Sequence, residues 1–184
     1  GKCCKELGYE TLSLDIDGRA DINMSILDWD YKAYPRDEFD IIWASPPCAT
    51  FSNLQYSNVG RKVNGEILTR DKIQENMIAI GDPLVKKALE IIKYFNPPLW
   101  FLENPNTGRL KEREYMSGIP YYIVDYCMYC QWGYRKRTRI WTNKCDWEAK
   151  VCDGKGTCGN MVGDKRMKHR TNVSGDDTRT CLDD

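Results

Sequence analysis

Cys48 lies in a stretch whose residue types suit nucleophilic chemistry. The residues before it, 39–44, form an apolar run of strand length. Pro46 and Pro47 then end the strand, because proline cannot extend a strand ladder and restricts the residue before it. We therefore expect Cys48 at the tip of a rigid turn, where a thiol with a fixed direction suits a nucleophile. The alternative is a buried cysteine that fills space, which is the commonest role of a free cysteine.

A second apolar run, residues 99–102, ends in Glu103, Asn104 and Pro105. If the two runs are strands of one parallel sheet, Cys48 and Glu103 follow them at the same carboxyl edge, where open α/β sheets bind ligands. Apolar surroundings would raise the pKa of Glu103 and let it carry a proton. The alternative is a glutamate that caps the following turn.

Further polar residues follow the other expected strands. Residues 134–143 alternate through Arg137 and Arg139, which predicts a strand with arginines on one face, and guanidinium groups bind phosphate and carbonyl oxygens well. Asp15 ends an alternating stretch, and an acid at the end of the second strand of a Rossmann-like sheet commonly binds a ribose hydroxyl. An ordinary turn aspartate is the alternative. Asp28 and Asp30, in the next loop, could meet an adenine amino group.

Strands and a helix must hold these residues in place. Apolar runs and alternation predict strands at about 11–16, 39–45, 99–103 and 119–128. Asp82 and Pro83 read as the N-cap and first residue of a helix that reaches residue 95. Residues 53–80 form a long polar stretch, helical from about 73, that we interpret as a lid. The pattern predicts one α/β domain, Rossmann-like, with a mostly parallel sheet and helices on both faces.

Composition narrows the setting. No run of 18 apolar residues exists and the N-terminus has no signal-peptide pattern, so we expect no membrane association and a reducing, cytoplasmic environment. Nine cysteines are many for 184 residues, and in that environment they serve catalysis, metal binding or packing. The net charge is zero, but residues 134–170 hold 11 basic against 4 acidic residues. This excess predicts a basic face for a polyanion or, more simply, a solvated face.

The C-terminal part combines cysteine with the chain's single histidine. Cys145, Cys152, Cys158 and His169 lie in a glycine-rich, charged stretch and form a ligand set known from structural zinc sites. Their spacing is longer than the paired spacing of common zinc fingers. Cys127 and Cys130 have that short spacing, but they fall on an expected strand, whose side chains alternate faces. Structural zinc and unpaired thiols are the two alternatives.

Three motifs occur in order along the chain: Ser45-Pro46-Pro47-Cys48, Glu103-Asn104-Pro105 and Arg135-Lys136-Arg137-Thr138-Arg139. Together they resemble the motifs of the cytosine-C5 DNA methyltransferase family, over about residues 1–143. The resemblance implies the S-adenosylmethionine-dependent methyltransferase fold and double-stranded DNA as the partner. It also fits bacterial, phage or viral DNA methylation, including restriction-modification, although a nuclear protein stays open.

The resemblance implies a role for each motif residue. Cys48 would attack C6 of an extruded cytosine, Glu103 would hold N3, and Asn104 would brace the Cys48 turn. Arg137 would bind the O2 carbonyl and Arg139 would support the site. Residues 53–80 would close over the extruded base.

The resemblance also implies the binding site of the methyl donor, S-adenosylmethionine. Its contacts would be Asp15 for the ribose, Asp28 for the adenine, and Pro46. The family's glycine-rich donor loop and the strand before it would lie upstream of Gly1, so residues 1–143 would be a partial catalytic domain. Another segment or a second chain would then supply this loop, and target recognition as well.

The chain departs from the family pattern in two further ways. Arg135 occupies the position of the family's glutamine, and only residues 144–184 follow where a large recognition region is normal. We interpret residues 144–184 as a small segment for reduced recognition or zinc binding. Three other functions remain: a non-catalytic nucleic-acid-binding subunit, an RNA cytosine methyltransferase, and an amino-methyltransferase. The last normally has an aromatic residue where this chain has Cys48.

Overall fold

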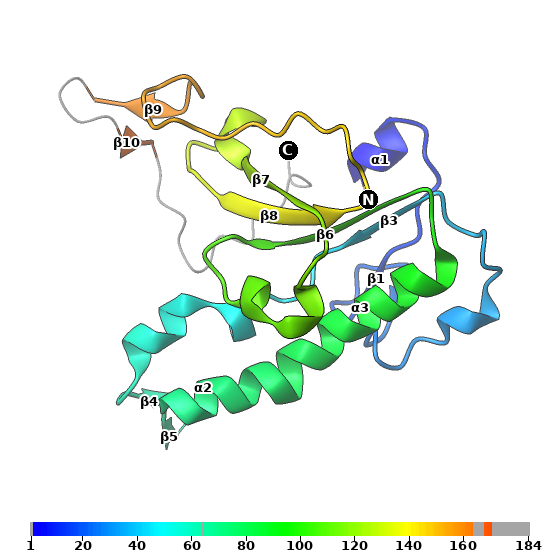
Figure 1. The fold of residues 1–184 in the computed structure, drawn as a ribbon, viewed down its shortest axis with the longest axis horizontal. Helices are drawn as coiled ribbons and strands as arrows, with labels where there is room; N and C mark the ends of the chain where they lie inside the picture. Colours follow the sequence, from blue (N-terminus) through cyan, green and yellow to red (C-terminus); the bar gives the residue numbers. More distant parts are fainter. Residues whose placement is uncertain (1, 64, 164–167, 171–184) are drawn as a thin grey trace.

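The structure, a computed structural model, describes residues 2–63, 65–163 and 168–170 and centres on a four-stranded sheet (Figure 1). The strand order is β3 (Ile41–Ala44), β6 (Leu99–Pro105), β8 (Arg137–Thr142) and β7 (Tyr121–Asp125). β3 and β6 are parallel, whereas β8 is antiparallel to both of its neighbours. The expected strands exist, but the predicted mostly parallel sheet is not confirmed. The connection from β7 to β8, residues 126–136, contains no α-helix of the kind that usually carries a parallel crossover, and β8 returns antiparallel to β7.

Shorter elements surround this sheet. Three two-stranded pairs join β1 (Leu14–Asp15) with β2 (Ile22–Asn23), β4 (Lys62–Val63) with β5 (Glu66–Ile67), and β9 (Met161–Val162) with β10 (Lys168–His169). Short 3₁₀ helices are η1 (Tyr31–Ala33), η2 (Ala49–Phe51), η3 (Asn53–Asn58), η5 (Leu110–Glu112), η6 (Glu114–Met116) and η7 (Tyr126–Met128). The strand predicted at 11–16 is thus only β1, and the one predicted at 119–128 turns into η7.

The helical part of the chain is longer than predicted. Near the N-terminus, α1 (Lys2–Glu6) ends before Gly8. The main helix runs through α2 (Arg70–Asn76), a π-helical turn η4 (Met77–Gly81) and α3 (Asp82–Phe95) without a break. Much of the predicted lid, residues 53–80, is therefore regular structure.

The prediction that Asp82 is an N-cap is wrong. The residue before it, Gly81, already has helical backbone angles, and the Asp82 side chain is buried against Arg113 and Tyr115, which donate hydrogen bonds to it. Pro83 is tolerated at this point because a wider π turn precedes it, so the missing N–H breaks no regular α-helical ladder. The Asp82 carboxylate serves a buried ion pair with Arg113. In the sequence alone, an aspartate before a proline looks the same as an N-cap.

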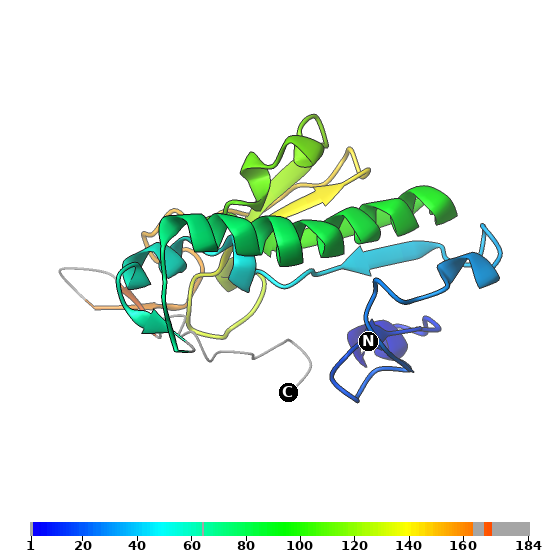
Figure 2. The ribbon, with the colours of Figure 1, turned by 90° about the horizontal axis from the view of Figure 1, so that it is seen from below.

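Helix α3 covers one face of the sheet, as Figures 1 and 2 show. Val85 and Ala88 on α3 belong to the same hydrophobic cluster as Leu102 on β6 and Trp141 on β8. Full burial of such a side chain contributes about 1.5–3 kcal/mol each, so this cluster fixes α3 and the strands that carry the polar motifs.

The opposite face of the sheet has a different cover. Residues 126–132 and 144–147, which precede and follow β8 in sequence, border it, and Trp147 makes ring contacts with Phe101 and Tyr122. A groove of about 490 Å³ remains there, lined by apolar side chains such as Trp43 and Phe101. In the described chain, the expected helical cover on both faces is therefore confirmed for the α3 face only. None of the described helices is long and apolar enough to cross a membrane.

Candidate active site

The parallel pairing of β3 with β6 sets the candidate site. Ala44 pairs with Leu102, so the segments that follow them leave the sheet side by side. Ser45 consequently lies next to Glu103, the residue that follows Leu102 in β6. Cys48 follows at the start of η2. The expectation that Cys48 and Glu103 follow neighbouring strands at one edge is confirmed; we call residues 45–52 and 103–109 the catalytic edge.

The Cys48 turn is fastened to the segment that follows β6. The Asn104 side-chain amide donates a hydrogen bond to the Pro46 carbonyl at 3.0 Å. The Arg109 backbone N–H donates to the Phe51 carbonyl at 2.8 Å. Asn104 and Phe51 are buried, whereas the Cys48 residue is exposed. The turn therefore presents its thiol to solvent from a buried and hydrogen-bonded base.

A close contact with the main helix completes this base. A Cβ atom at Gly81 would lie 2.5 Å from the Thr50 hydroxyl oxygen and 2.7 Å from the Phe51 ring. Both distances are far below van der Waals contact, so the π-helical turn approaches the Cys48 turn this closely only with glycine at position 81. The helix thus supports the turn directly.

Glu103 is a buried carboxyl group at this edge, with its side chain 10% exposed. Burial raises the pKa of Glu103, and the nearby Lys136 ammonium and the Ser45 hydroxyl offset only part of that rise. The Lys136 nitrogen lies 3.6 Å from Glu103 Oε1, which is longer than a hydrogen bond. Glu103 Oε1 has no hydrogen-bond partner among the described residues. A carboxyl group in this state suits binding and protonation of an incoming ring nitrogen.

The two candidate arginines have different surroundings. Arg137 donates two hydrogen bonds to Asp125, from Nε at 3.0 Å and from Nη2 at 2.7 Å. Although burial alone would raise it, the pKa of Asp125 is held below its ordinary value by hydrogen bonds from Arg137 and Arg135. Arg139 instead pairs across the strands with Asn104, the residue that fastens the Cys48 turn.

Arg139 keeps lighter contacts than Arg137. Its Nε donates to the Asn106 side-chain oxygen at 3.1 Å, and its guanidinium carbon lies 3.8 Å from the centre of the Tyr121 ring. Neither partner is a carboxylate, so Arg139 carries a charge that no described ion pair neutralises. Its register beside Asn104 also brings it close to the catalytic edge.

The candidate donor-binding residues lie on separate segments. Asp15 ends β1, is exposed, and accepts a hydrogen bond from the Ile16 backbone N–H at 2.6 Å. Asp28 is exposed in a turn closed by its own N–H and the Ser25 carbonyl. The Pro46 carbonyl is engaged by Asn104. Exposed carboxylates such as Asp15 suit ribose hydroxyls, which donate hydrogen bonds.

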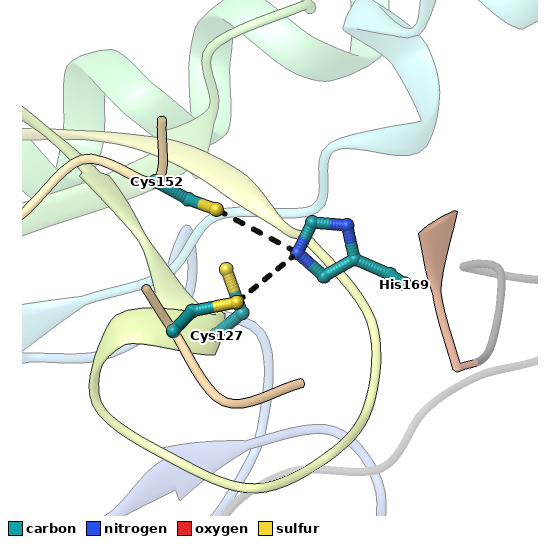
Figure 3. A group of neighbouring side chains, drawn as sticks. Cys127, Cys152 and His169 are labelled. Atoms are coloured by element: carbon teal, nitrogen blue, oxygen red, sulfur yellow. Dashed lines mark hydrogen bonds between the residues drawn. The ribbon is translucent and has the colours of Figure 1, made fainter. Parts of the chain in front are cut away.

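A third group of polar side chains is a potential metal site. The ligand atoms of Cys127, Cys152, Cys158 and His169 all lie within 4.8 Å of one another, and Figure 3 shows three of these side chains facing each other. Cys145, which we included in the predicted set, is exposed and lies outside this group. Cys127 takes its place because the chain leaves β7 at Asp125 and turns through η7, which redirects its side chain.

Three residues of these sites escaped the sequence prediction. Cys127 was visible in a short-spaced pair but was assigned to a strand. Lys136 lies within the arginine motif, at a position between the arginines to which we gave no role. Asp125 ends an apolar strand, as Asp15 and Glu103 do, and that position was its only signal.

No protein-family model matches the chain. The chain is 44% identical over 160 residues to a "Probable DNA (cytosine-5)-methyltransferase" of Frog virus 3 (isolate Goorha). The matched region covers 86% of this chain and 72% of the viral protein.

Proposed function

Because the chain belongs to the cytosine-C5 DNA methyltransferase family, we propose that it transfers a methyl group from S-adenosylmethionine to C5 of a cytosine in double-stranded DNA. The observation that carries this proposal is the joint placement of two groups. The exposed Cys48 lies on a turn that is hydrogen-bonded to Asn104 of β6. Glu103, the residue before Asn104 in β6, has a buried carboxyl group. Nucleophile and proton carrier are thereby oriented by one strand end.

The chemistry explains why both groups are needed. C5 of cytosine is a poor nucleophile, and addition of the Cys48 thiolate to C6 makes C5 enamine-like. Glu103 supplies a proton or hydrogen bond at N3, which relieves the negative charge that develops on the ring. C5 then takes the methyl group, C5 loses its proton to a base, and the Cys48–C6 bond breaks as the aromatic ring is restored.

We assign the O2 contact to Arg139 and a supporting role to Arg137, the reverse of the expectation from the motif. Two hydrogen bonds commit Arg137 to the buried Asp125. Arg139 has no such carboxylate partner among the described residues and pairs across the sheet with Asn104, the residue after Glu103. A guanidinium that lies near the carboxyl end of β6 suits a ring carbonyl on the same cytosine.

For the donor, we propose that the Asp15 carboxylate binds the ribose and that Asp28 meets the adenine. S-adenosylmethionine supplies an electrophilic methyl group on a sulfonium. Its methionine part needs backbone N–H groups of the kind that glycine-rich turns present. We propose that a segment or chain outside residues 1–184 supplies this turn, so residues 1–184 alone bind the donor weakly.

The target base must leave the duplex to reach Cys48. We restrict the proposed lid to residues 53–68, because the helix begins at Arg70. Both strands of the β4–β5 hairpin in this stretch are exposed, as a segment that closes over a substrate requires. The basic residues of segment 134–170 provide charge for the DNA backbone.

The test is methyl transfer from labelled S-adenosylmethionine to DNA by the full-length protein, followed by digestion to nucleosides. We expect 5-methylcytosine from the wild type and none from Cys48→Ser, because a hydroxyl is far less ionised than a thiol. Cys145→Ser, at an exposed cysteine outside the catalytic edge, is the matched control and should match the wild type. Label in N4-methylcytosine or N6-methyladenine would contradict the proposal.

A further inference from the structure

Three thiols and one imidazole converge at the end of β7. Cys127 comes from η7, Cys152 and Cys158 from the irregular segment that follows β8, and His169 from β10. All four ligand atoms lie within 4.8 Å of one another. The His169 Nε2 atom lies 3.8 Å from Cys152 Sγ and 3.6 Å from Cys158 Sγ, an arrangement that Figure 3 shows in part.

These separations match a tetrahedral metal centre. With metal–sulfur bonds of about 2.3 Å and metal–nitrogen bonds of about 2.1 Å, two corners of a tetrahedron are about 3.6–3.8 Å apart. Three cysteines and one histidine form a closed ligand set without an open coordination position, which is typical of structural rather than catalytic zinc. We propose that Cys127, Cys152, Cys158 and His169 bind one structural Zn²⁺ ion.

The backbone around Cys152 supports a metal-bound thiolate. The Gly154 N–H points at Cys152 Sγ, 3.4 Å away. Gly154 has a φ angle of 76°, which a residue with a side chain rarely adopts, so glycine permits this tight turn. Hydrogen bonds to the ligand atoms of a metal site orient the ligands and are part of the site's stability.

The charges nearby also fit. One Zn²⁺, three thiolates and a neutral imidazole carry a net charge of −1. Arg135 donates from Nη2 to the Cys152 carbonyl at 3.2 Å, and Arg137 donates to the same Asp125 carboxylate that accepts a hydrogen bond from the Cys152 N–H. Arg135 and Arg137 share the Asp125 carboxylate, so these three groups carry a net charge of +1, which offsets the −1 of the cluster.

The described residues of the C-terminal segment, 144–163 and 168–170, have few apolar contacts with the sheet besides the ring contacts of Trp147. None of its described residues belongs to the buried core of the two hydrophobic clusters. Its buried link is polar: the Asn160 side-chain amide donates to the carbonyls of Cys127, Cys130 and Cys158 at 2.9–3.1 Å. A metal ion that joins η7 to this segment would supply the stability that an apolar core supplies elsewhere.

Zinc at this site would also help to hold Arg137 of β8 in place. The Cys152 backbone N–H donates to Asp125 Oδ2 at 2.8 Å, and Asp125 is the carboxylate that binds Arg137. The proposed ligand Cys152 is thus hydrogen-bonded to Asp125, the acid that orients Arg137. The metal therefore fixes the Asp125 end of β7 as well as the C-terminal segment.

The first test is metal content of the full chain, purified under reducing conditions and measured by elemental mass spectrometry. We expect about one zinc per chain in the wild type and a loss of most of it in Cys158→Ser. Cys145→Ser and Cys130→Ser are matched controls and should keep their zinc. Cys145→Ser tests the ligand set predicted from sequence, and Cys130→Ser tests the short-spaced pair. No zinc in the wild type, even after incubation with zinc salt, would overturn the proposal, as would iron in its place.

A second measurement does not depend on any variant folding. X-ray absorption at the zinc edge of the wild-type protein should give three sulfur neighbours at about 2.3 Å and one nitrogen at about 2.0–2.1 Å. A first shell of nitrogen and oxygen alone would place the zinc on other residues and refute the assigned ligands. Four sulfur neighbours would replace His169 by another cysteine and also contradict them.

Discussion

The catalytic edge and the C-terminal segment are held in place by different interactions. The catalytic edge rests on apolar packing, since Phe51 and Leu102 belong to the same buried cluster as α3. Apart from the ring contacts of Trp147, the C-terminal segment is joined to η7 by Asn160 and by the group of three thiols and an imidazole. The contrast shows that the part of the chain with the proposed catalytic groups is supported by the general core. The segment beside it depends on a few specific ligands.

Asp125 is where the two regions meet. It binds Arg137 of the sheet on one side and the Cys152 N–H of the C-terminal segment on the other. A change confined to the catalytic edge should therefore leave the C-terminal segment intact, and a change at Asp125 or its partners should disturb both. The variants below separate these cases.

The largest effect is expected for Glu103→Gln. Loss of a proton carrier should lower kcat by roughly 10²–10⁴-fold, with DNA binding and zinc content near those of the wild type. The raised pKa of Glu103 means that its carboxyl keeps its proton to higher pH than an exposed glutamate. The wild-type rate should fall as pH rises through that pKa, and the variant should lack this limb.

Glu114→Gln, at an exposed glutamate on η6, is the matched control for kinetics and should behave as the wild type. Steady-state methyl transfer across pH measures the rates, and DNA affinity is compared at one salt concentration. A Glu103→Gln protein with wild-type kcat would remove Glu103 from the mechanism.

Next in size is the effect of Arg137→Ala on stability. The variant leaves the fully buried Asp125 with Arg135 as its remaining cation. Breaking a buried ion pair costs about 3–5 kcal/mol, and Arg135 should reduce this to about 3 kcal/mol. Urea unfolding measures the free energy, and the zinc content should fall because the Cys152 N–H bonds to the same carboxylate.

The sign of the pH dependence follows from the lowered pKa of Asp125. Its stabilising contribution is present above the unfolded-state pKa of about 3.9 and is lost as pH falls through the lower folded-state pKa. In Arg137→Ala, the free energy of unfolding should therefore fall less steeply as pH is lowered. Arg139→Ala, which breaks no ion pair with a buried carboxylate, is the comparison and should cost about 1 kcal/mol. Equal costs for the two variants would contradict the different roles given to the arginines.

A smaller effect is expected for Asn104→Ala at the catalytic edge. It removes the amide that binds the Pro46 carbonyl and should cost about 1–3 kcal/mol in unfolding free energy. The rate of methyl transfer should fall because the Cys48 turn loses its fastening, while zinc content stays unchanged. Asn53→Ala removes a side-chain bond to the Thr107 carbonyl in an exposed setting and should cost less. Loss of zinc in Asn104→Ala would contradict the claim that the catalytic edge and the C-terminal segment are stabilised independently.

The catalytic edge could be predicted from sequence because its signals are local. Apolar runs end in prolines and polar residues at Cys48 and at Glu103, and only one long-range inference, the parallel pairing of β3 with β6, was needed. The antiparallel return of β8 beside β6 was missed, because alternation identifies a strand but not its partner or direction. The apparent N-cap at Asp82 failed for a similar reason: its partners, Arg113 and Tyr115, are distant in sequence.

The potential metal site could be predicted only in part. Cys152, Cys158 and His169 stood out by residue type in a stretch with few apolar residues. Choosing Cys127 over Cys145 required the turn at η7, which brings a residue from another part of the chain to this group. Residue types thus indicated the chemistry of the site, but folding of distant segments decides the ligand set.

The central claim is that Cys48 forms a bond to C6 of cytosine. The most direct measurement uses DNA that contains 5-fluorocytosine, since the fluorine cannot leave as a proton does and the Cys48–C6 bond persists after methyl transfer. With S-adenosylmethionine, the full-length protein should form an adduct that survives denaturation, and peptide mass spectrometry should locate it on Cys48. Cys48→Ser should form none. An adduct on another cysteine, or no adduct with any cytosine-containing DNA, would contradict the claim.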